Sequence, residues 1–186
     1  MEMMTKTHPV VIYCMYFPVI GFMLYYGAAV KRIPAGMEVL LFIAGVLFWT
    51  FFEYLMHRYL FHMIVESPRA KKFIYTMHGV HHEYPRDKER LFMPPVPSLI
   101  VATVVFSIMY FIMGWSALSF FTGFLFGYIA YGSMHFAIHA FAPPKMLKAL
   151  WRNHHLHHYK APEKGFGVSS VLWDIIFKTV PKKDEV

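Results

Sequence analysis

The sequence predicts an all-α integral membrane protein: four transmembrane helices below a cytosolic, histidine-rich helical cap that holds a dimetal centre. Three observations predict this fold class. Hydrophobic residues make up 57% of the 186 residues and charged residues only 16%, against about 25% charged in ordinary soluble domains. Uncharged stretches long enough to cross a bilayer recur along the chain. Of the 12 histidines, 11 fall in four short clusters. We expect residues 1–186 to form a single membrane domain.

The apolar stretches place four spans, at about residues 10–30, 37–56, 96–113 and 117–134. The second of these carries Glu38 and Glu53 near its two ends, where charge is tolerable. Residues 7–30 carry no formal charge, and a helix needs about 20 residues to cross a bilayer. A cleaved signal peptide is the alternative for this run, although its apolar core would exceed the usual length of about 7–15 residues. Residues 91–144 are also uncharged and fit two spans, joined at Gly114 and entered through a group of prolines.

The distribution of basic residues predicts the orientation. With four spans, both termini and the segments 57–93 and 135–186 lie on one side, which receives 16 Lys and Arg residues against two (Lys31 and Arg32) on the other. The positive-inside rule places that side in the cytoplasm, and we expect a bacterial inner membrane. The net charge of +7 does not indicate nucleic acid, because the basic residues flank apolar runs.

The histidines have the spacing of ligands on helices. Positions three or four apart share a helical face, which groups His78 with His81 and His82, His135 with His139, and His154 with His157 and His158. His57 and His62 are five apart, so we expect the helix to end or distort between them. His155 points away from its neighbours and is left out of the ligand set.

Ten clustered histidines offer more nitrogens than one metal uses, so the pattern predicts two metal ions. Imidazole suits zinc, copper, iron and nickel alike, and zinc-dependent hydrolysis stays an alternative. A metal transporter is a remote alternative, because no clustered histidine falls mid-span. The membrane setting favours oxidation of a lipid C–H bond with O₂, for which we expect iron. The single cysteine, Cys14, excludes a disulfide within the chain and a cysteine-based zinc site.

The boxes resemble those of the membrane-bound fatty acid hydroxylase superfamily, and within it the fatty acid 2-hydroxylases. The likeness covers roughly residues 45–180. It rests on Glu53-Tyr-Leu-Met-His57-Arg-Tyr-Leu-Phe-His62, His78-Gly-Val-His81-His82-Glu-Tyr-Pro85, His157-His158-Tyr-Lys, Gly165-Phe-Gly-Val168 and Trp173-Asp174. Many relatives carry a fused haem domain before the first span, for which the nine residues here leave no room. The chain therefore resembles a bare catalytic domain.

The resemblance implies a diiron monooxygenase that hydroxylates a long-chain fatty acyl lipid at C2 with O₂ as co-substrate. Zinc can replace iron in a purified sample. The implied metal ligands are His57, His62, His78, His81, His82, His135, His139, His154, His157 and His158. Glu53 and Asp174 are candidates to orient these ligands, by accepting a histidine N–H, or to form ion pairs, in the case of Glu53 with Arg58 or a lysine.

Two expectations concern partners and rivals. The chain has no nucleotide-binding fingerprint and no cysteine set for an iron–sulfur cluster, so a separate electron carrier, a ferredoxin or small cytochrome with its reductase, must supply electrons. The basic segments 86–90 and 145–152 are candidates to steer it. A carotenoid or sterol hydroxylase or desaturase of the same superfamily is the alternative enzyme, and the Gly165–Val168 motif favours the fatty acyl branch.

Overall fold

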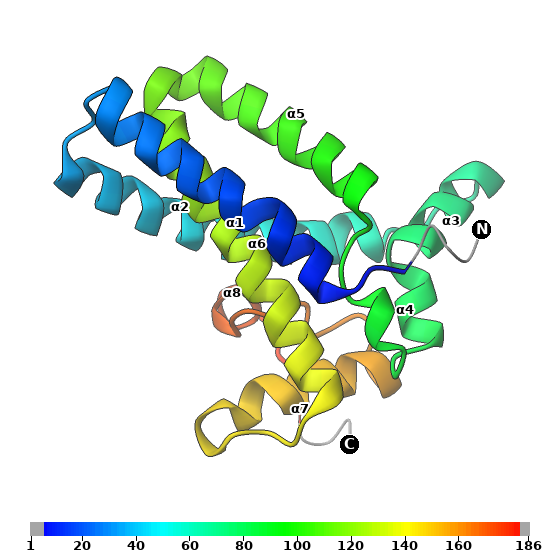
Figure 1. Ribbon diagram of the computed structural model, residues 1–186. Coiled ribbons are helices and arrows are strands. Elements are labelled where there is room, and N and C mark those ends of the chain that lie inside the picture. The colour runs from blue at the N-terminus through cyan, green and yellow to red at the C-terminus, as the bar shows by residue number, and fades with distance from the viewer. Residues whose placement is uncertain (1–5, 183–186) are drawn as a thin grey trace.

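The computed structural model describes residues 6–182, and every regular element in this range is helical (Figure 1). Four helices are long: α1 (Pro9–Tyr25), α2 (Ala35–Leu55), α5 (Pro95–Met113) and α6 (Ala117–Ala140). Four are short: α3 (Pro68–Ile74), α4 (Val80–Glu83), α7 (Lys148–Tyr159) and α8 (Leu172–Ile176). Three π-helical turns extend α1, α2 and α3, at Tyr26–Val30, Met56–Phe61 and Tyr75–Gly79, and single 3₁₀ turns lie at Lys88–Arg90, Gly114–Ser116 and Lys145–Leu147.

Three helical segments are long and apolar enough to cross a membrane: Pro9–Val30, Ala35–Phe61 and Lys88–Ala140. The third contains both α5 and α6, which fold back on each other at Gly114, a residue with φ of 57° (Figure 1). The four predicted spans fall within these segments. α5 begins at Pro95, as the proline group predicted, because proline is tolerated in the first helical turn.

Two helices extend beyond the predicted spans. α2 begins at Ala35, two residues before its span. α6 runs six residues past the predicted end of its span, so His135 and His139 stand on its last turns. One unbroken helix therefore joins the apolar bundle to the histidines.

The bundle is centred on the contact between α2 and α6, where small residues let the backbones touch. A Cβ on Gly123 would lie 1.9 Å from the carbonyl oxygen of Phe42, and a Cβ on Gly45 would lie 1.9 Å from that of Phe120. A Cβ on Gly127 would meet Trp49 Cβ at 2.5 Å. Gly123 and Gly127, four residues apart on one face of α6, thus allow the two helices to approach closely.

Short helices gather at the end of the bundle where α2 and α6 finish (Figure 1). α7 lies beyond the end of α6, and α4 lies beside it, while α8 packs back against α2. Trp173 of α8 donates its indole N–H to Thr50 of α2 at 3.0 Å, and its ring centroid lies 4.6 Å from that of Phe51. This arrangement brings the four histidine clusters together from elements far apart in the sequence.

Candidate metal centre

The structure brings ten histidines into two sets of five. The first set is His57, His62, His78, His82 and His157, and the second is His81, His135, His139, His154 and His158. In each set, one ring nitrogen from every histidine lies within 4.8 Å of those of the other four. These ten are the residues that the sequence predicted as ligands. His155 belongs to neither set: its side chain is exposed and its Nδ1 lies 2.7 Å from the Trp151 carbonyl oxygen.

A π-helical turn solves the awkward spacing of His57 and His62. The helix of α2 widens at Met56–Phe61, and the His62 N–H donates to the His57 carbonyl at 3.3 Å, five residues back. A bond of this span makes residues five apart neighbours on one face. The predicted distortion is confirmed, and it places both imidazoles in the first set.

Each of the two histidine triplets that share a helical face is divided between the two sets. His78, in the π-helical turn before α4, and His82 of α4 join the first set, while His81 of α4 joins the second. In α7 the pattern is reversed, with His154 and His158 in the second set and His157 in the first. Residues four apart share one set because they lie more nearly above each other than residues three apart.

The nitrogen spacing fits a metal ion at the centre of each set. In the first set, His78 Nε2 lies 3.0 Å from His57 Nε2 and 2.9 Å from His82 Nε2. In the second, His158 Nε2 lies 3.1 Å from His81 Nε2 and 3.0 Å from His154 Nε2. An ion with imidazole ligands at about 2.1 Å separates adjacent nitrogens by about 3.0 Å in octahedral geometry.

Several buried ring nitrogens support the same interpretation. His62 Nε2 and both ring nitrogens of His135 are buried without a hydrogen-bond partner. Such groups are rare in folded proteins and call for a specific reason. A metal ion at the centre of each set provides a partner for His62 Nε2, in the first set, and for one ring nitrogen of His135, in the second.

Backbone carbonyls orient two histidines of the first set. His57 Nδ1 lies 2.6 Å from the Phe166 carbonyl oxygen, and His157 Nδ1 lies 2.8 Å from that of Lys164. Each Nδ1–H therefore donates to a carbonyl, which leaves the Nε2 lone pair directed at the set. Burial and the neighbouring imidazoles lower the pKa of His157 to about 3, and the same causes lower the pKa of His82 to about 4. Both rings are neutral at pH 7, as metal binding requires.

Two buried carboxylates hold the loop that supplies these carbonyls. Glu53 Oε1 accepts from the amides of Val168 at 2.6 Å and Ser169 at 2.9 Å, and Oε2 accepts from the Ser169 hydroxyl. Asp174 accepts from the amides of Phe166 at 3.0 Å and Gly167 at 2.8 Å. We call residues 164–169 the anchor loop, since its backbone is fixed from both sides.

This finding corrects the two partners predicted for Glu53. Its hydrogen bonds go to the anchor loop, and neither a histidine N–H nor Arg58 is among its partners in the described chain. Asp174 likewise contacts the anchor loop and not the histidines themselves, and it also accepts a hydrogen bond from the Thr179 hydroxyl at 2.7 Å. Burial raises the pKa of Asp174, while these hydrogen bonds act in the opposite direction.

The sequence did not indicate that the carbonyls of Lys164 and Phe166 orient histidines, although the motif Gly165-Phe-Gly-Val168 contains two closely spaced glycines. Gly165 has a φ of 71°, which favours glycine, and a Cβ on Gly167 would lie 2.1 Å from the Ser170 carbonyl oxygen. Glycines at alternate positions are the signal of a backbone that must turn tightly. Nothing in the local sequence shows which side chain such a loop approaches.

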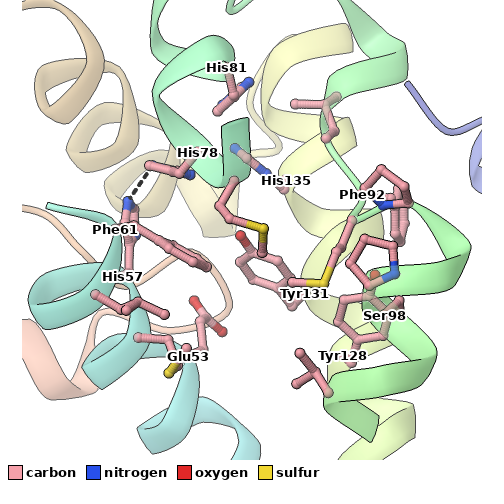
Figure 2. A pocket seen from close by; sticks show the side chains of 18 of the residues that line it. Glu53, His57, Phe61, His78, His81, Phe92, Ser98, Tyr128, Tyr131 and His135 are labelled. Carbon is pink, nitrogen blue, oxygen red and sulfur yellow. Dashed lines mark hydrogen bonds between the residues drawn. The ribbon is translucent and has the colours of Figure 1, made fainter. Parts of the chain in front are cut away.

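A cavity of about 200 Å³ lies beneath both sets, between α2, α5 and α6 (Figure 2). His57 and His78 of the first set and His81 and His135 of the second line its polar end. The rest of the wall is largely apolar and aromatic, and includes Trp49, Phe52, Phe61, Phe92, Phe124 and Leu125. Such a cavity suits a hydrocarbon chain with one end at the histidines.

Comparison with known proteins agrees with this geometry. The model of the fatty acid hydroxylase family matches residues 42–179. The ceramide very long chain fatty acid hydroxylase of Saccharomyces cerevisiae is 36% identical over 183 residues, covering 96% of this chain and 47% of that protein. The dihydroceramide fatty acyl 2-hydroxylase FAH1 of Arabidopsis thaliana is 37% identical, covering 75% of this chain and 60% of that protein.

A solved structure is also similar. It is described as full-length scs7p with only the hydroxylase domain visible, and it superposes with a TM-score of 0.92 at 35% sequence identity. The match covers 98% of this chain and 70% of that chain. The chain spans about half the length of the curated relatives named above.

Proposed function

Because the chain belongs to the fatty acid hydroxylase family, we propose that it hydroxylates a long-chain fatty acyl lipid at C2. The names of its relatives support this choice, since they are a ceramide fatty acid hydroxylase and a fatty acyl 2-hydroxylase. The overall reaction joins the acyl C–H, O₂, two electrons and two protons to give the 2-hydroxy product and water.

The observation that carries the proposal is the apolar cavity that ends at histidines of both sets (Figure 2). An acyl chain inside it leaves water and buries hydrocarbon, which is worth about 0.8 kcal/mol per methylene. The polar carboxyl or amide end then lies at the histidines, because most of the remaining wall is apolar. This orientation brings the carbon beside the carbonyl to the metal centre.

We propose that His57, His62, His78, His82 and His157 hold one iron, and that His81, His135, His139, His154 and His158 hold the other. When bound, the two irons supply the O₂ chemistry that breaks an unactivated C–H bond. The protein contributes fixed imidazole directions, through the anchor loop, and a cavity from which water is excluded. Phe92 closes part of that cavity by packing against Gly132, where a Cβ would lie 2.0 Å from its ring.

We further propose that α1, α2, α5 and α6 each cross the membrane and that the metal centre faces the cytoplasm. The excess of basic residues on the segments that carry the histidines supports this orientation. A substrate acyl chain then reaches the cavity from within the bilayer. A separate electron carrier reaches the metal centre from the aqueous side.

The test is reconstitution of the iron-loaded protein in lipid with a fatty acyl ceramide, O₂ labelled with ¹⁸O, and a ferredoxin with its reductase and NADPH. We expect a 2-hydroxyacyl product that carries one labelled oxygen, detected by mass spectrometry. Phe124→Ala enlarges the cavity and serves as a positional control, since the product should stay at C2. Conversion of a carotenoid or sterol in place of the acyl lipid would refute the substrate class.

A further inference from the structure

The helix α7 has one face turned to the metal centre and one to solvent. His154 and His157 are fully buried on the inner face. The exposed residues of the opposite face, spaced four, three and four apart as one helical stripe requires, are Lys148, Arg152, His155 and Tyr159. We call these four residues the outer stripe. It combines two fixed positive charges with two aromatic rings.

The outer stripe lies on the far side of the histidines from the apolar bundle. The histidine sets fill the space between the ends of α2 and α6 and the inner face of α7. Figure 1 shows α7 beyond the end of α6, away from the turn between α1 and α2. A bilayer around α1, α2, α5 and α6 therefore leaves this stripe facing water.

The stripe is also close to the second histidine set. The His155 ring centroid lies 6.3 Å from that of His139, and the Tyr159 centroid lies 6.1 Å from that of His158. His155 and Tyr159 are themselves 6.4 Å apart and stacked. A molecule seated on the stripe is thus separated from ligands of this set by a single ring.

The charge around α7 is strongly one-sided. Residues 145–164 contain a single acid, Glu163, and five basic residues, which are Lys145, Lys148, Arg152, Lys160 and Lys164. The other basic segment, 86–90, is largely neutralised within the protein. There Asp87 accepts from Arg90 at 2.9 Å and lies 3.5 Å from Lys6, which also lies 3.4 Å from Glu89.

We propose that the outer stripe is the docking surface for a negatively charged one-electron carrier that delivers electrons to the second histidine set. The inference rests on the proposed function, which consumes two electrons per O₂. Two successive dockings of a one-electron carrier supply them, each oxidising one carrier. Charge complementarity selects an acidic carrier, because opposite potentials speed encounter and set orientation.

The probe is a plant-type [2Fe–2S] ferredoxin, tested against the zinc-loaded protein in nanodiscs of neutral phosphatidylcholine. Zinc prevents turnover, so the Kd reports docking alone. The test variant, called the α7 variant, is Lys148→Glu/Lys160→Glu, which changes one lysine of the stripe and the exposed lysine that directly follows it. It spares Arg152, because the Arg152 guanidinium donates to the Pro181 carbonyl at 3.2 Å. The matched control is Lys71→Glu/Lys72→Glu on exposed positions of α3, with the same change in net charge.

We expect the α7 variant to raise the Kd about tenfold at low ionic strength, with the difference shrinking as salt is added. The control should bind like the unmodified protein. Equal weakening by both variants would overturn the proposal, since it would show attraction by net charge alone. If the α7 variant binds ferredoxin normally but no longer binds vesicles of anionic lipid, the stripe binds lipid headgroups, and the proposal is also overturned.

A second measurement separates this proposal from the proposed function. In the iron-loaded protein, the α7 variant should raise the KM for ferredoxin and leave turnover driven by dithionite unchanged. If neither the unmodified protein nor either variant forms product with dithionite, the result counts against the hydroxylase function. The comparison of Kd values for ferredoxin would still test the docking surface in that case.

Discussion

Asp174→Ala tests whether the anchor loop controls one metal site and not the other. The substitution leaves the amides of Phe166 and Gly167 buried without their acceptor. Each costs about 1–3 kcal/mol, so we expect the free energy of unfolding to fall by about 2–6 kcal/mol. The Thr179 hydroxyl keeps a partner, because Tyr54 lies 3.0 Å from it.

The consequence for metal binding is selective. A displaced anchor loop removes the Phe166 carbonyl from His57 and the Lys164 carbonyl from His157, both of the first set. Loss of such an orienting partner lowers metal affinity by about 10–100-fold. Within residues 6–182, no hydrogen bond joins a histidine of the second set to this loop, so their site should keep its affinity. Asp174→Asn retains one carbonyl oxygen and should show an intermediate effect.

The assay is zinc titration of the purified protein against a competing chelator, which resolves two binding steps per chain. We expect the zinc affinity of one binding step to fall in Asp174→Ala and the affinity of the other step to stay unchanged. Gly127→Ala is the control, because it strains the contact with Trp49 and destabilises the bundle without removing a hydrogen bond to the loop. Equal weakening of both steps, or of the same step in Gly127→Ala, would refute the argument.

Three further predictions follow from the packing and the titrating groups. Gly123→Ala should lower the Tm, because the added Cβ meets the Phe42 carbonyl oxygen at 1.9 Å. Gly21→Ala should leave the Tm unchanged, because its Cβ has nothing within 4 Å. Thermal unfolding of both variants in detergent measures the difference. His157→Ala should weaken the same zinc-binding step as His57→Ala, whereas His155→Ala should weaken neither of the two steps. If His157→Ala instead weakens the step that His154→Ala weakens, the sets are wrongly assigned. Metal-free protein should lose stability as pH falls from about 6.5 to 4, by up to about 1.4 kcal/mol per pH unit for each buried histidine. The reason is that burial lowers the pKa of His82 to about 4, so the unfolded chain binds more protons than the folded chain in this pH range. Urea unfolding at several pH values measures the free energy of unfolding, and a flat pH profile would contradict the prediction.

The sequence predicted the elements that depend on composition and local spacing. Long apolar runs became α1, α2, α5 and α6, since a run of apolar side chains favours a helix that lipid can cover. Helix spacing indicated which histidines of one cluster lie close together, and the fold then brought the four clusters to the same end of the bundle. Hydropathy alone did not indicate that α6 continues to Ala140, since tertiary contacts decide where a helix stops.

The role of Glu53 could not be predicted, because it depends on a contact across 115 residues. Its position four residues before His57 suggested a local partner, yet its carboxylate accepts from Val168 and Ser169. A buried carboxylate binds whichever amides the fold brings to it, and those amides had no helix or sheet partner of their own. Long-range backbone contacts of this kind leave no periodic signal.

The spacing H-x-x-H-H has a geometric meaning that becomes clear only with two sets of ligands. In the triplet at the start of α4, His78 and His82 serve one set and His81 serves the other, and the triplet in α7 does the same with the sets exchanged. Each set thus receives two histidines from one triplet and one from the other. A pair from the end of α2 completes the first set, and a pair from the end of α6 completes the second. Five imidazoles at each site follow from two triplets and two pairs. The step of about 100° between adjacent helical residues directs His82 away from His81, so one helix can serve both sites only if they lie side by side.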